Sequence, residues 1–181
     1  GPGGISSWRG HQCVAPSHIG IATVTYLFEG EILHRYSVGS YQPIRPGDIN
    51  LMVAGSGIAH SERERPEVTA KDHHLHGLQL WLALPENHEE TGPAFHHYPD
   101  DNIPAVEIDG VPVLQFSETL YLEATLKAGQ TLELPEAPER AVYIASGALR
   151  AHGSELPTHS MTIFSREPGV AITAMEDSRI A

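Results

Sequence analysis

Residues 17–62 read SHIGIATVTYLFEGEILHRYSVGSYQPIRPGDINLMVAGSGIAHSE, and this stretch decides the fold of the chain. Short runs rich in β-branched and aromatic residues alternate in it with turn signals such as Pro46-Gly47-Asp48. The runs predict strands over 21–28, 32–36 and 49–53, then a further strand that carries His60 and Glu62. The stretch therefore predicts a β-domain built of short strands joined by tight turns.

The last of these strands suggests a metal site. Side chains alternate across a strand, so His60 and Glu62 point to the same face. His18, at the mouth of the first strand, is a candidate for a third ligand. Two histidines and one carboxylate suit non-haem Fe(II) oxygen chemistry, because the metal keeps open positions for O2 and substrate. Spacing alone leaves a second interpretation open, in which His60 and Glu62 form a hydrogen-bonded polar pair at a barrel rim.

The sequences TVTYLFEG, IRPGD, AGSGIAHSE and HGLQLW lie between about Pro16 and Pro85. Through them this region resembles the first domain of the pirin family, within the cupin superfamily. The resemblance implies an all-β bicupin, two tandem jelly-roll-like β-barrels. We expect an N-terminal cupin domain with the metal site over 1–85, a connection over 86–104, and a C-terminal cupin-like domain without a metal site over 105–181.

The resemblance also implies the ligand set. Pirins bind their metal with three histidines and one glutamate, and three of these positions match His18, His60 and Glu62. The position of the first histidine holds Pro16, whose side chain cannot bind a metal, so one ligand is missing unless His11 or another group takes its place. The implied cofactor is a divalent transition metal, Fe(II) first, with Mn, Ni, Cu and Zn as alternatives.

A second departure from the family lies close to this site. The aspartate that pirins usually carry after His34-Arg35 is Tyr36 in this chain.

The segment 76–84 is a continuous apolar run that predicts a strand buried on both sides. Within it, the resemblance suggests that Gln79 lies close to the metal cavity.

The second half of the chain repeats the strand and turn order of the first. A hairpin is predicted around Asp109-Gly110, followed by strands over 120–126 and 131–134, a hairpin over 139–150 that turns at Ser146-Gly147, and strands over 161–164 and 170–174. His152 and His159 are isolated, and neither has a carboxylate partner at strand spacing. We interpret both as exposed turn residues.

Composition limits the possible partners and compartment. The net charge of −12 argues against direct nucleic-acid binding, which needs a basic surface. The single Cys13 excludes an internal disulfide and suits a reducing cytosol. No apolar run is long enough to span a bilayer, and the first residues do not resemble a signal peptide. We therefore expect a cytoplasmic protein without membrane contact.

Two classes of function follow from the resemblance. The first is a flavonol (quercetin-type) 2,3-dioxygenase that uses O2, with Glu62 as candidate base and Leu51, Met52 and Trp81 as an apolar wall for a small aromatic substrate. The second is a non-catalytic, metal-responsive regulatory protein that contacts a protein partner. A degenerate pirin that has lost its metal is a third possibility.

Overall fold

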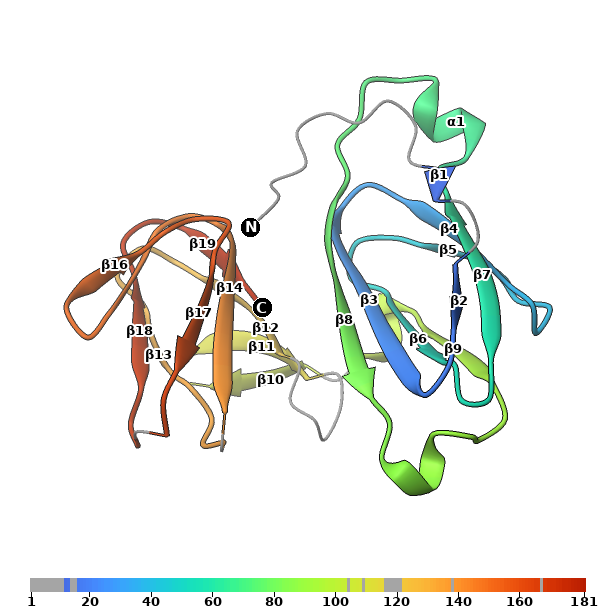
Figure 1. The fold of residues 1–181 in the computed structure, drawn as a ribbon. Helices are drawn as coiled ribbons and strands as arrows, with labels where there is room; N and C mark the ends of the chain where they lie inside the picture. Colours follow the sequence, from blue (N-terminus) through green and yellow to red (C-terminus); the bar gives the residue numbers. More distant parts are fainter. Residues whose placement is uncertain are drawn as a thin grey trace. The chain divides into compact units, whose positions relative to one another are not determined.

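The computed structural model describes residues 12–13, 16–103, 105–108, 110–115, 122–137, 139–166 and 168–181, with 12–13, 105–108 and 111–115 as backbone only. The chain divides into two compact units that meet in sequence between Asn102 and Ile103. Both are built of short antiparallel strands (Figure 1), which confirms the predicted all-β fold class. The alternative ligand His11 lies outside the described residues.

The first unit consists of two sheets. Its elements are β1 (Gln12–Cys13), β2 (Ser17–His18), β3 (Ile21–Glu29), β4 (Ile32–Tyr36), β5 (Tyr41–Ile44), β6 (Ile49–Val53), β7 (Ile58–Arg63), α1 (Pro66–Thr69), β8 (His76–Ala83), the 3-10 turn η1 (Glu86–His88), β9 (Ala94–Tyr98) and the 3-10 turn η2 (Asp100–Asn102). One sheet has the order β1-β7-β4-β5, with β2 also paired to β7, and the other has the order β8-β3-β6-β9.

Local chemistry explains the turn that joins β5 to β6. Gly47 has a φ of 91°, a conformation that residues with a Cβ rarely adopt. Asp48 Oδ2 accepts a hydrogen bond from the backbone N–H of Arg45 at 3.0 Å and closes the turn. The turn brings β6 back against β3, where Asn50 is paired with Thr25.

Two small apolar clusters among the described residues belong to the core of the first unit. Tyr36, Met52, Ala54 and Ile58 pack together in one, with Phe95 against them. Leu27, Ile32 and Ile44 form the other. Because Tyr36 belongs to the first cluster, the core lies directly beside the inward face that carries His60.

The structure differs from the sequence prediction in two segments. The segment 86–104, expected to be a surface connection, contributes β9, which pairs with β6 from Ile49↔Tyr98 to Val53↔Ala94. The prediction that the strand over 76–84 is buried on both sides is wrong, because Trp81 is 63% exposed and Leu82 is 36% exposed. Among the described residues, β8 pairs with β3 alone and so forms one edge of its sheet.

The second unit has its own core. Its strands are β10 (Ala105–Ile108), β11 (Val111–Gln115), β12 (Leu122–Leu126), β13 (Thr131–Glu133), β14 (Arg140–Ser146), β15 (Leu149–Ala151), β16 (Ser154–Leu156), β17 (Met161–Phe164), β18 (Ala171–Ala174) and β19 (Ser178–Ile180). They form sheets of order β10-β11-β12-β19-β14-β17 and β13-β18-β15-β16. Leu126, Ile144, Leu149 and Ile172 are fully buried. His152 and His159 are exposed, as predicted.

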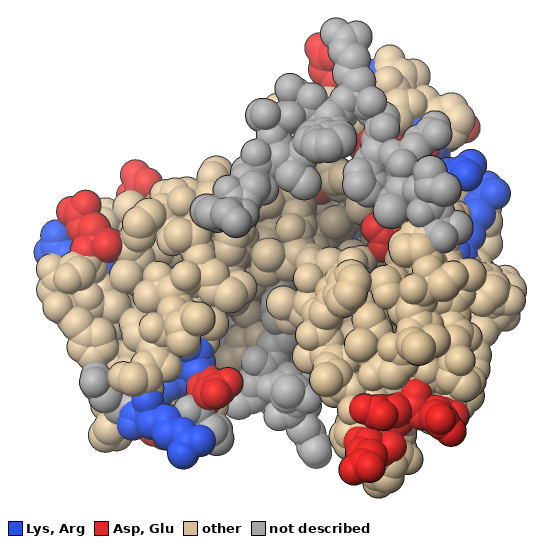
Figure 2. Space-filling model, in the orientation of Figure 1, with Lys and Arg blue, Asp and Glu red and all other residues tan. Residues whose placement is uncertain are grey.

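The visible surface agrees with the acidic composition. Figure 2 shows acidic side chains gathered at the lower right, where Figure 1 draws the segment that contains η1. This segment carries the exposed residues Glu86, Glu89 and Glu90. No helix among the described residues is long and apolar enough to cross a membrane.

Candidate functional site

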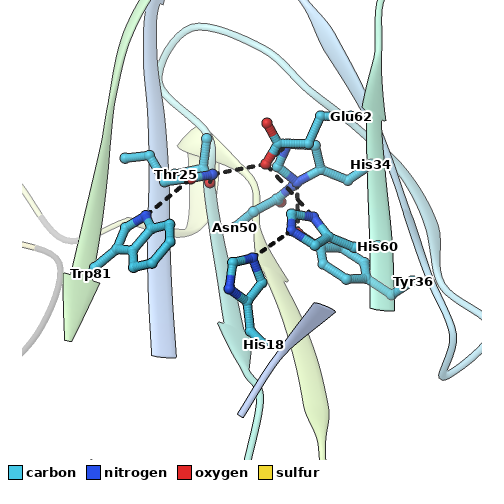
Figure 3. Close-up of polar contacts among 9 residues, drawn as sticks. His18, Thr25, His34, Tyr36, Asn50, His60, Glu62 and Trp81 are labelled. Carbon is cyan, nitrogen blue, oxygen red and sulfur yellow. Dashed lines mark hydrogen bonds and ion pairs between the residues drawn. The ribbon is translucent and has the colours of Figure 1, made fainter. Parts of the chain in front are cut away.

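Strand pairing gathers the site on the inward face of the first unit. β4 and β7 are neighbours in register, with His34 opposite Glu62 and Tyr36 opposite His60. Because alternate residues of a strand share a face, these four side chains point the same way. β2 pairs with the start of β7, with His18 opposite Ile58, and so brings a fifth side chain to the cluster (Figure 3).

His18 and His60 face each other through their ring nitrogens. Their Nε2 atoms are 3.0 Å apart, and the rings are tilted at 44°. The His60 ring also stacks on Tyr36, at 5.3 Å between centroids and 7° between planes. Burial lowers the pKa of His60, and neighbouring His18 lowers it further against the opposing pull of Glu62. His60 is therefore neutral near pH 7, the state in which an imidazole can bind a metal.

This pair has the spacing of two neighbouring ligands of one ion. Two nitrogens that each lie about 2.1 Å from a metal, at a right angle to each other, are about 3 Å apart. The Nε2 atoms of His18 and His60 match that separation. The separation alone is thus compatible with two neighbouring ligands of one ion, and equally with a hydrogen bond between the two rings.

Glu62 lies on the other side of the His60 ring. Its Oε1 atom accepts a hydrogen bond from Gln79 Nε2 at 2.8 Å. The same oxygen is 3.7 Å from His60 Nδ1 and 3.7 Å from His34 Nε2. The three predicted ligands are thus close together, but they do not converge on one point. Among the described residues, no group of three His, Cys, Asp or Glu side chains is arranged to hold a metal ion. The role of Glu62 as a ligand stays a prediction.

A buried polar network lies behind Glu62. Tyr36 Oη and Asn50 Nδ2 both contact His34 Nδ1, at 2.8 and 3.1 Å. His97 Nδ1 donates to Asn50 Oδ1 at 2.7 Å. With the Asn50 amide donating, His34 Nδ1 accepts, so the ring proton is on Nε2 and points to the Glu62 side.

Burial also sets the protonation state of this network. His34 has no exposed surface, and burial lowers its pKa to about 4, so the ring is neutral. Burial raises the pKa of the Tyr36 hydroxyl, which stays protonated. Within the described part of the chain, His34 Nε2 and His60 Nδ1 have no hydrogen-bond partner, although both lie near Glu62 Oε1. Two neutral rings therefore adjoin a single carboxylate.

The mouth of the site is aromatic. The Trp81 ring is nearly perpendicular to the His18 ring, at 5.0 Å between centroids and 85° between planes. Its Nε1 donates to Gln79 Oε1 at 3.3 Å, and Gln79 Nε2 also donates to Thr25 Oγ1 at 3.2 Å. The exposed ring of Trp81 thus borders the histidine pair from the solvent side (Figure 3).

The predicted apolar wall is only partly correct. Met52 is fully buried in the cluster with Tyr36 and faces inward. Leu51 lies between Asn50 and Met52 on β6, so alternation turns its side chain to the opposite face of the sheet. Trp81 remains as the exposed aromatic element of the site.

Sequence reasoning did not assign His34, Asn50 and His97 to the site. For His34 a signal was available, because it shares a face of one strand with Tyr36. Asn50 and His97 are joined only by the pairing of β6 with β9, where they stand opposite each other. That pairing could not be inferred while 86–104 was interpreted as a connection.

Known proteins resemble this chain in sequence and fold. The sequence profile of the Pirin family matches residues 8–82. A pirin-like protein of Caulobacter vibrioides is 41% identical over 90% of this chain and 62% of its own length. Pirin-1 of Arabidopsis thaliana is 32% identical over 89% of this chain and 60% of its own length. A crystal structure of quercetin 2,3-dioxygenase from Acinetobacter baumannii is 31% identical in sequence and superposes with a TM-score of 0.77. The superposition includes 93% of this chain and 60% of the A. baumannii chain.

The fold and the site define a bicupin whose first unit carries a histidine pair beside a carboxylate. Residues 8–82 match the pirin family, and pirin-like relatives align with about 90% of the chain. It spans less than two thirds of the length of the relatives named above.

Proposed function

We propose that the first unit binds a divalent transition metal at His18 and His60 and uses O2 to open a flavonol-like substrate, as a quercetin 2,3-dioxygenase does. The facing Nε2 atoms of the histidine pair, 3.0 Å apart, carry this proposal. Glu62 would complete the ligand set as its third member. Fe(II) suits two histidines and a carboxylate, and Mn, Ni, Cu and Zn are the alternatives.

When bound, the metal would orient the flavonol oxygen and lower the barrier to electron transfer towards O2. The protein side chains supply the rest. The exposed Trp81 ring offers a surface for a flat aromatic molecule next to His18. Tyr36 holds the His60 ring by stacking, which keeps Nε2 directed at His18. Glu62 is the carboxylate nearest the pair and the candidate acceptor for the substrate hydroxyl proton.

The comparisons support the same reaction class. The A. baumannii structure at 31% identity is described as a quercetin 2,3-dioxygenase. This chain spans 60% of that protein.

The test is O2 consumption with quercetin after reconstitution with each of the five metals in turn. We expect quercetin-dependent O2 uptake with at least one metal and its loss in His60→Ala. His159→Ala is the matched control, because this exposed histidine lies in a turn of the second unit. No uptake above the metal-only background with any of the metals would contradict the dioxygenase proposal.

One observation favours a second function, a metal-responsive protein that binds a partner without catalysis. Only two imidazoles of the described site converge, and Pro16 stands where pirins usually carry a further histidine. A metal bound by fewer protein ligands is held more weakly, and its occupancy would then follow metal supply. Reversible metal binding at the histidine pair without O2 uptake would favour this function over the dioxygenase.

A further inference from the structure

We propose that Trp81 has two separable roles: its ring binds the flat face of an aromatic ligand, and its indole N–H positions Glu62 through Gln79. The first role deepens the proposed function, since it names the surface that receives the substrate. The second role concerns the geometry of the site itself. It is measurable whether or not the protein turns over a flavonol.

The binding role follows from exposure and position. Trp81 is 63% exposed although it lies on the inward face of β8, opposite Thr23 on β3. Its ring plane is nearly perpendicular to that of His18, and its exposure leaves ring surface available for stacking. A planar ligand on this face would lie beside the histidine pair. Stacking of aromatic rings in offset or edge-to-face geometry is the interaction that such a surface favours.

The positioning role follows from the donor and acceptor chemistry of Gln79. An indole Nε1 can only donate a hydrogen bond, so the Gln79 amide must turn its oxygen towards Trp81. The NH2 group then points the opposite way, where it reaches Glu62 Oε1 at 2.8 Å and Thr25 Oγ1 at 3.2 Å. The Trp81 N–H and the acceptor-only Glu62 carboxylate therefore select the same orientation of the amide.

Without the indole donor, the Gln79 oxygen loses its contact with Trp81, and the amide is held through the contacts of its NH2 group with Glu62 and Thr25. The amide can then pivot about that group. The carboxylate that it contacts can shift from its place 3.7 Å from His60 Nδ1. Trp81 is thus a positioning residue that acts on Glu62 through Gln79.

Phenylalanine and leucine at position 81 separate the two roles. Trp81→Phe keeps an aromatic ring and removes the N–H, whereas Trp81→Leu removes both. The matched control is Tyr98→Leu, which removes another exposed aromatic ring from β9 of the same unit. Circular dichroism establishes that each variant is folded before it is used.

The ring role is tested by calorimetric titration of quercetin into the metal-free protein. We expect Trp81→Phe to bind within about 2-fold of wild type and Trp81→Leu to bind roughly 3- to 10-fold more weakly, the range for loss of one aromatic contact. Tyr98→Leu should bind as wild type does. Equal binding by wild type and Trp81→Leu, or no binding by wild type, would overturn the ring role.

The positioning role is tested by NMR of the glutamine side-chain amides. The Gln79 signals are those that disappear from the spectrum of Gln79→Glu. We expect them to shift in Trp81→Phe and to stay in place in Tyr98→Leu. If the protein consumes O2 with quercetin, Trp81→Phe should lower kcat while KM changes little. Unshifted Gln79 signals in Trp81→Phe would overturn the positioning role.

The outcomes separate this inference from the proposed function. Absence of O2 uptake with every metal contradicts the dioxygenase and leaves the binding and amide measurements intact. Conversely, O2 uptake together with unshifted Gln79 signals supports the dioxygenase and removes Trp81 from the positioning of Glu62.

Discussion

The Nε2 atoms of His18 and His60 lie 3.0 Å apart, although the two residues are separated by 42 positions in the chain. The antiparallel pairing of β2 with β7 brings them together, since it sets His18 opposite Ile58, two residues before His60. Tyr36 stacks on His60 from the neighbouring strand and limits the rotation of its ring. The histidine pair is therefore a consequence of sheet register and core packing.

Removal of the Glu62 carboxylate should destabilise the first unit. Gln79 Nε2 would lose its contact with Glu62 Oε1, and His34 Nε2 and His60 Nδ1 would lose the carboxylate that lies 3.7 Å from each. A hydrogen bond contributes about 0.5–1.5 kcal/mol net to stability. We expect Glu62→Ala to lower the free energy of unfolding in urea by this order. Glu62→Gln, which keeps one acceptor oxygen, should lose less; an equal loss in both variants would show that hydrogen bonding at this position does not matter.

The Tyr36 hydroxyl should contribute to stability through His34. Tyr36→Phe removes the 2.8 Å contact with His34 Nδ1 and keeps the ring that stacks on His60. The expected cost is about 1 kcal/mol, as for a typical buried hydrogen bond. Tyr98→Phe changes an exposed tyrosine and should cost less than about 0.5 kcal/mol. Urea unfolding of both variants makes the comparison, and equal stabilities would contradict the role given to this hydroxyl.

Glu31 should make folding dependent on acid pH. Burial by itself raises the pKa of Glu31, but its hydrogen bonds and ion pairs with Arg65 and Arg45 outweigh burial and hold the pKa below its usual value of 4.5. Because the folded-state pKa is the lower one, the stabilisation is complete above pH 4.5 and is lost as the pH falls through the folded-state value.

Glu31→Gln tests this linkage. The difference in unfolding free energy between wild type and Glu31→Gln should be largest near neutral pH and shrink below pH 4.5. A series of urea unfolding curves between neutral and acid pH measures it. A constant difference across the series would mean that the Glu31 cluster with Arg45 and Arg65 does not shift this carboxyl group.

Sequence patterns predicted the strands well where composition and turns agree. The strands over 32–36, 49–53 and 161–164 have the predicted bounds as β4, β6 and β17. β9 was missed because histidines and nearby prolines give 86–104 the composition of a loop. The structure shows what makes it a strand: Phe95 stacks on Tyr36 at 4.4 Å and joins the core of the first unit.

The sequence predicted that His60 and Glu62 share a face, but it predicted neither the buried neighbours His34, Asn50 and His97 nor the geometry of the cluster. The period of two along a strand was enough to put His60 and Glu62 on one face. The position of the Glu62 carboxylate relative to the His60 ring depends on contacts with other strands, namely Gln79 on β8 and His34 on β4. Such partners are set by register between strands, which a single sequence leaves open.

Metal content is the most direct measurement of the central claim, that His18 and His60 form a metal site. Protein reconstituted with Fe(II), freed of unbound ions and analysed for its elements should contain near-stoichiometric metal. His18→Ala and His60→Ala should lose it, and His159→Ala should retain it. Wild-type protein that retains no metal after reconstitution with any of the candidate ions, or a His60→Ala variant that retains as much as wild type, would contradict the account.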